Sequence, residues 1–161
     1  QRFSVKILTI LVFIFFTNGV NAKSDSYASD FFGVSIDIPT MKANKIQEVQ
    51  EIADFFLPSV DLFSANVGIQ KQYFKGTMID YNELSLSQFR KAGWRVVDAK
   101  NLLNESFWEY VGSMLGYDLH WYSRAVKKDN YVYLVTATAL SSKWDSQKDI
   151  LRKSVNSFKI K

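Results

Sequence analysis

The stretch Gly116–Leu140, GYDLHWYSRAVKKDNYVYLVTATAL, decides the fold of this chain. Both of its halves are rich in aromatic and β-branched residues, which favour strands, and the polar segment Lys127–Asn130 separates them. Two such runs around a short polar break are typical of an antiparallel β-hairpin. We therefore expect the rest of the chain to pack around this hairpin.

Alternation along the first arm of the hairpin predicts which side chains face the core. The expected core-facing side consists of Leu119, Trp121, Ser123 and Ala125. The expected water-facing side consists of Asp118, His120, Tyr122 and Arg124. A shift of one residue would exchange the two faces, because side chains along a strand alternate with a period of two.

The segment after the hairpin, Ser141–Phe158, changes to helical spacing, with Ser141 or Ser142 as the expected N-cap. The apolar stripe of this helix consists of Trp144, Ile150 or Leu151, Val155 and Phe158. Its expected outer side consists of Lys148, Asp149, Arg152 and Lys153. The helix should lie across the sheet, with Phe158 and Ile160 packed against it.

Four earlier segments have the composition or alternation of strands. They are Phe32–Pro39, Val67–Phe74, Trp94–Lys100 and Phe107–Met114. Pro39 ends the first of them, because proline cannot donate to a β-ladder. Gly112 and Gly116 are candidate β-bulges.

Two further segments have the signals of helices. Asn44–Phe56 combines a capping-box pattern with an apolar stripe and is stopped by Pro58. A second helix ends at Ala92, because Gly93 is suited to the left-handed position that follows a helix. Asp80 or Ser85 is the expected start of this second helix.

The first 22 residues have the pattern of a secretory signal peptide. Arg2 and Lys6 give a basic start, an apolar run follows, and Val20–Ala22 has the small residues of a cleavage site. The apolar run is shorter than the roughly 20 residues that span a bilayer. We therefore expect cleavage after Ala22 and a single mature domain, residues 23–161, that is periplasmic or secreted and has no stable membrane anchor.

The charge balance and the absence of cysteine argue against several classes of function. The chain has 20 basic and 16 acidic residues, and the loss of Arg2 and Lys6 with the signal would leave 18 against 16. So small an excess does not indicate nucleic-acid binding. There is no cysteine, which excludes disulfides, thiol nucleophiles and thiolate metal sites. The mature domain must therefore be stable through its core alone.

The order of these elements resembles that of the PsbP-like superfamily, which includes the Ran-binding Mog proteins, and in particular its small secreted bacterial members. The segments that carry the resemblance are Ile36–Pro39, Trp94–Val97, Glu109–Gly112, Tyr133–Thr138 and Ser157–Phe158. The resemblance covers nearly all of the mature chain. It implies an α+β fold in which helices pack on the faces of an antiparallel sheet, as an α/β/α sandwich. It also implies accessory or binding roles, some as chaperones for apolar helices, and it transfers no functional residue.

The sequence predicts no catalytic, cofactor or metal site. His120 is the only histidine, and Asp118 is the only acid near it in the same strand, which is too few ligands for a typical metal centre. A Ser-His-Asp triad remains open on composition, but no Gly-x-Ser-x-Gly motif marks a nucleophile.

The surplus of aromatic residues indicates a recognition face, since tyrosine and tryptophan combine large contact area with a polar group. The candidate binding face consists of Trp108, Tyr110, His120, Tyr122 and Arg124. We therefore expect a non-enzymatic binding or accessory protein of the bacterial envelope with a protein partner. The alternatives are a carrier or chaperone for an apolar ligand or helix, and then a hydrolase that uses His120. The oligomeric state stays open.

Overall fold

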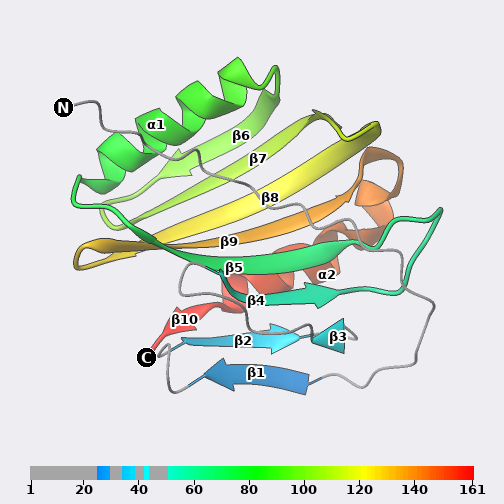
Figure 1. The fold of residues 1–161 in the computed structure, drawn as a ribbon, viewed down its shortest axis with the longest axis horizontal. Coiled ribbons are helices and arrows are strands. Elements are labelled where there is room, and N and C mark those ends of the chain that lie inside the picture. The colour runs from blue at the N-terminus through cyan, green and yellow to red at the C-terminus, as the bar shows by residue number, and fades with distance from the viewer. Residues whose placement is uncertain (1–24, 30–33, 39–41, 44–50) are drawn as a thin grey trace.

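The computed structural model describes residues 25–29, 34–38, 42–43 and 51–161. Its main layer is a seven-stranded antiparallel sheet with the order β3-β4-β5-β9-β8-β7-β6 (Figure 1). In chain order these strands are β3 (Lys42–Ala43), β4 (Glu51–Phe56), β5 (Asn66–Tyr73), β6 (Arg95–Asn101), β7 (Glu105–Met114), β8 (Tyr117–Lys128) and β9 (Tyr131–Leu140). A small second sheet has the order β1-β2-β10 and consists of β1 (Asp25–Ser29), β2 (Val34–Ile38) and β10 (Lys159–Ile160). The α+β fold with an antiparallel sheet is confirmed.

The predicted hairpin is β8 and β9, which pair without a break from Leu119↔Leu140 to Lys128↔Tyr131. The core-facing side of β8 is as predicted: Leu119, Trp121, Ser123 and Ala125 are all buried. The opposite side is not simply water-facing. His120, Tyr122 and Arg124 are half-buried, because the closing helix packs over them.

Two helices cover opposite faces of the sheet, each over a different part (Figure 1). Helix α1 (Met78–Lys91) packs on β6 and β7, where Tyr81 and Phe89 contact the ring of Trp108. Helix α2 (Trp144–Ser157) follows a short 3₁₀ turn and packs on β9, β8 and β5. Both helices leave part of their sheet face open, and this offset creates the site described below.

The helix predicted over Asn44–Phe56 is wrong for its last six residues. Glu51–Phe56 is strand β4, paired with β5, and residues 44–50 lie outside the described part of the chain. Ile52, Ala53 and Phe55 are all buried. Apolar residues at such close spacing fit either a helix stripe or a strand buried on both faces. Glu51–Phe56 forms a strand because it pairs with β5.

The predicted C-terminal end of helix α1 is confirmed, and its predicted start is wrong. Gly93 has the expected left-handed conformation with φ of 75°. The helix starts earlier than predicted, because Thr77 caps it and forms a reciprocal capping box with Asp80. The cap predicted for α2 is also wrong, since Lys143 precedes the helix and no side chain caps it.

The glycines predicted as bulges have other roles. Gly112 pairs in register with Leu119, and a Cβ there would collide with the indole of Trp94. Gly116 has φ of 82° in the β7–β8 turn, a conformation that glycine adopts at little cost. The register shifts lie instead between Glu51 and Ala53 in β4 and between Val96 and Asp98 in β6.

Candidate functional site

A groove of about 350 Å³ lies beside α2 on the sheet face that this helix covers. Helix α2 also packs on β2 of the small sheet, but within the seven-stranded sheet its main contacts are with β9, β8 and β5. The groove therefore opens where that sheet continues past the helix to β7 and β6. Its lining comes from three strands and one helix. The residues are Asp98, Lys100, Phe107, Trp108, Glu109, Tyr122, Arg124 and Asn156.

Strand register places the groove floor in two rows of directly opposed residues. One row runs Asp98↔Glu109↔Tyr122 across β6, β7 and β8. The neighbouring row runs Lys100↔Phe107↔Arg124. Opposed residues in an antiparallel sheet point to the same face, so all six side chains project into the groove. The register shift between Val96 and Asp98 in β6 sets this pairing for Asp98 and Lys100.

Phe107 gives the groove an apolar centre between charged groups. Its ring lies 6.4 Å from the ring of Tyr122 and 5.6 Å from the guanidinium of Arg124. Lys100 and Asp98 are exposed at the edge strand, and no ion pair to Lys100 is found in the part of the chain that the structure describes. The groove thus offers an aromatic surface with one cation and one anion at its rim.

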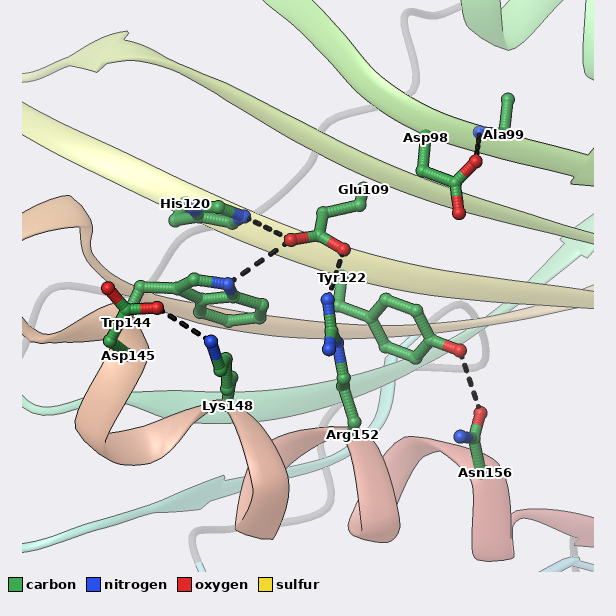
Figure 2. Close-up of polar contacts among 10 residues, drawn as sticks. All are labelled: Asp98, Ala99, Glu109, His120, Tyr122, Trp144, Asp145, Lys148, Arg152 and Asn156. Carbon is green, nitrogen blue, oxygen red and sulfur yellow. Dashed lines mark hydrogen bonds and ion pairs between the residues drawn. The ribbon is translucent and has the colours of Figure 1, made fainter.

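Glu109 connects the groove floor to α2 (Figure 2). Its Oε1 accepts hydrogen bonds from His120 Nε2 at 2.7 Å and from Trp144 Nε1 at 3.2 Å. Its Oε2 pairs with the guanidinium of Arg152. That guanidinium also lies 5.7 Å from the Trp144 ring and 5.6 Å from the Tyr122 ring. Arg152, predicted to point outward, therefore belongs to the helix–sheet contact.

The charges of this cluster follow from its surroundings. Partial burial alone would raise the pKa of the Glu109 carboxyl, but hydrogen bonds from His120 and Arg152 outweigh burial and hold that pKa below its ordinary value. Burial lowers the pKa of His120, against the opposing effect of the Glu109 carboxylate. At neutral pH the imidazole is therefore uncharged, and the hydrogen bond to an ionised Glu109 assigns its proton to Nε2.

The side chain of His120 is fixed between α2 and the sheet by one ring contact and one hydrogen bond. Its ring stacks on the indole of Trp144 with centroids 4.0 Å apart and planes 9° from parallel. Its hydrogen bond goes to Glu109, and among the described residues no serine or threonine hydroxyl bonds to it. An imidazole with an acid but without a nucleophile lacks one member of a hydrolytic triad. In the same part of the chain, no group of three or more acidic or histidine side chains is placed to hold a metal ion.

Acid should destabilise the protein in two steps. The folded state binds protons at His120 and Glu109 less readily than the unfolded chain, so the free energy of unfolding falls as pH drops. The loss begins below the ordinary pKa of 6.5 for His120 and below 4.5 for Glu109. We expect His120→Gln to remove the first step and keep the second. Thermal melts on both sides of pH 6.5 check this, and an unchanged first step in the variant would contradict it.

Arg124 holds the end of α2. Its Nε donates to Glu105 at 2.8 Å, and its Nη1 donates to the carbonyl oxygens of Asn156 and Phe158, both at 3.0 Å. These carbonyls lie at the helix C-terminus, where a cation is favourable. Tyr122 fixes the same turn through a hydrogen bond to Asn156. Arg124 and Tyr122, two residues of the predicted binding face, therefore also form the groove wall.

The structure splits the predicted binding face between the two sides of the sheet. His120, Tyr122 and Arg124 lie together on the α2 side, of which Tyr122 and Arg124 line the groove. Placing the side chains of Trp108 and Tyr110 on that face is wrong, since both are 1 % exposed and pack under α1. Trp108 Nε1 donates to Asn82, and the Tyr110 hydroxyl bonds to Ser123.

Trp108 and Tyr110 were assigned to the wrong face because the sequence does not show which residues of β7 lie opposite which residues of β8. Tyr110 lies opposite Trp121, so the two side chains share the core face. The same register brings Glu109 opposite Tyr122 and Phe107 opposite Arg124. Sequence reasoning missed Phe107, Glu109 and Lys100 as site residues. The two-residue turn at Leu115–Gly116 was the one signal that could have fixed this pairing.

Comparison with known proteins supports the fold. The cyanobacterial PsbP protein CyanoP of Synechocystis matches with a TM-score of 0.64 and 13% identity, over 90% of this chain and 97% of its own. A Pseudomonas aeruginosa protein of unknown function, PA94, described as a putative regulator, matches with a TM-score of 0.59 and 18% identity, over 82% and 93%. LpqN of Mycobacterium tuberculosis, described as involved in cell envelope biogenesis, matches with a TM-score of 0.55 and 10% identity, over 85% and 84%.

These matches establish a PsbP-like fold. No family model matches the chain, and no curated protein does. At such low identity the likeness concerns architecture, because unrelated functions share folds. No helix in the described part of the chain is both long and apolar enough to cross a membrane.

Proposed function

We propose that this chain is an exported, non-enzymatic binding protein of the bacterial envelope that holds a protein partner in the groove beside α2. The observation that carries the proposal is the groove floor, where the ring of Phe107 lies between Tyr122 and Arg124 while Lys100 and Asp98 stand exposed at its edge. Aromatic rings and arginine are enriched at the energetic centres of protein interfaces.

The groove chemistry favours a partner segment with one apolar side chain flanked by polar groups. Phe107 and Tyr122 supply the apolar contact, and Lys100 and Asp98 can pair with opposite charges at the rim. Because Arg124 and Glu109 are already committed to α2, the walls are preformed. A preformed groove lowers the entropic cost of binding.

Export rests on the N-terminal pattern, in which a basic start, an apolar run and small residues at Val20–Ala22 precede the domain. An envelope location agrees with the description of LpqN, a protein of the same fold. It also agrees with the absence of cysteine, since a disulfide-free domain is stable in either redox state.

A carrier for an apolar ligand is less well supported. Such a protein needs open apolar space between helix and sheet, and Trp144 and Phe158 fill that space under α2. Trp121 fills the core on the other face. The groove beside α2 offers open volume, but its rim is charged.

The test compares two substitutions that should leave the fold intact. Phe107→Asp places a charge at the groove centre, whereas Leu115→Asp, in the exposed β7–β8 turn, serves as the control. Against the partner isolated on the wild-type protein from envelope extract, we expect Phe107→Asp to weaken binding at least about tenfold, as for a central interface residue. Equal binding by both variants, with equal melting temperatures, would refute the groove as the binding site.

A further inference from the structure

We propose that one end of the sheet, formed by the β5–α1 connection and the β6–β7 and β8–β9 turns, docks reversibly on an anionic membrane surface. The three segments meet at the same end of the molecule (Figure 1). Backbone hydrogen bonds join them: Lys127 N donates to Asn104 O at 2.8 Å, and Phe74 N donates to Asn130 O at 2.7 Å. The three segments therefore form one continuous surface, which we call the basic end.

Exposed apolar side chains gather at the basic end. Of the nine large hydrophobic residues exposed in the described part of the chain, five lie there: Tyr73, Ile79, Leu102, Leu103 and Tyr131. Leu103 is 88% exposed at the tip of the β6–β7 turn, and Tyr73 is 60% exposed at the end of β5. Leucine at a loop tip and tyrosine beside it are the residues that enter the interfacial region of a bilayer.

Lysines surround these apolar groups. Residues 71–75 and 127–131 hold four lysines and one acid, Asp129. Of the acids in the adjoining segments, Asp80 is bonded to Thr77 and Glu105 is paired with Arg124. Lys71 Nζ lies 4.2 Å from the Tyr131 ring, and Lys75 Nζ lies 6.0 Å from the Tyr73 ring. Each ammonium group thus lies over an aromatic ring, so that cationic and aromatic groups alternate on this surface.

This charge pattern selects an anionic lipid surface as the occupant. Lysines near a membrane gain attraction from anionic headgroups, and the apolar tip gains from insertion among them. Each contribution alone gives weak attachment, so both together predict reversible binding. The groove beside α2 reaches the β6–β7 turn through Lys100 and Phe107, but its lining includes none of the five exposed apolar residues of the basic end, so substitutions at the two surfaces can be made separately.

Flotation with lipid vesicles tests the proposal on the full chain as export leaves it. We expect binding to vesicles that contain phosphatidylglycerol, little binding to pure phosphatidylcholine, and release by high salt. Leu103→Ser with Lys75→Glu should weaken binding at least about tenfold, since it removes the exposed tip and reverses one charge.

The matched control is Leu115→Ser with Lys91→Glu, which makes the same two changes at the opposite end of the sheet. It should bind as the wild-type protein does. Any of three vesicle results would overturn the proposal: no binding to anionic vesicles, equal binding to neutral vesicles, or equal loss in both double variants. Binding of an acidic protein partner by this end, without binding to vesicles, would also overturn it.

Discussion

Replacement of Trp144 with alanine is expected to lower the free energy of unfolding by about 3–5 kcal/mol, the usual cost of truncating a buried tryptophan. Trp144 is 4 % exposed and stacks on His120. It also donates to Glu109 and supports the guanidinium of Arg152. Its loss leaves a cavity at the start of α2 and removes one of the donors to a partly buried carboxylate.

Urea titration and thermal melting measure this effect. Phenylalanine at the same position keeps a ring on His120 but removes the indole donor, so Trp144→Phe should cost about 1.5–3 kcal/mol, the value of one hydrogen bond to a charged group. A loss below about 1 kcal/mol in the alanine variant, well under the ordinary range for tryptophan truncation, would mean that Trp144 does not anchor α2.

Arg124→Ala is expected to cost about 2 kcal/mol, because it removes the ion pair with Glu105 and two hydrogen bonds to the C-terminal carbonyls of α2. The side chain is 18% exposed, so solvent screening keeps the cost below that of a fully buried pair. The loss should be local: relative to the wild-type protein, amide hydrogen exchange should accelerate more in the last turn of α2 than in its middle.

The Arg124→Lys variant separates the effect of the positive charge from the effect of the planar guanidinium group. Lysine keeps the positive charge but cannot reach Glu105 and two carbonyls with one planar group, so it should restore less than half of the lost stability. Lys153→Ala, an exposed charge on α2, is the control for the loss of a cation. If the last turn of α2 exchanged no faster in the Arg124→Ala variant than in the wild-type protein, the capping role would be contradicted.

The fold class, the β8–β9 hairpin and helix α2 could be predicted from the sequence because their patterns are local. The alternation in β8, the apolar stripe of α2 and the glycine after α1 each depend on neighbours a few residues away. Glu51–Phe56 was misassigned because its buried residues satisfy a helix period and a doubly buried strand equally well. Only the pairing with β5 distinguishes the two.

The candidate site was less accessible to sequence reasoning because it depends on which residues of β7 and β8 face each other. Tyr110 and Tyr122 are both tyrosines in aromatic-rich strands. Yet Tyr110 is buried in the core, whereas Tyr122 lines the groove. Glu109 gains its role from Arg152, which lies 43 residues away in the chain. No local pattern encodes such a contact.

Photo-crosslinking in living cells tests most directly whether the groove is a docking surface. A photoreactive phenylalanine derivative replaces Phe107 in one strain and Leu115 in another, so that the probe lies in the groove or in the exposed β7–β8 turn. The account predicts a discrete crosslinked species from position 107 that is absent from position 115. No adduct at position 107, or the same adducts from both positions, would contradict it.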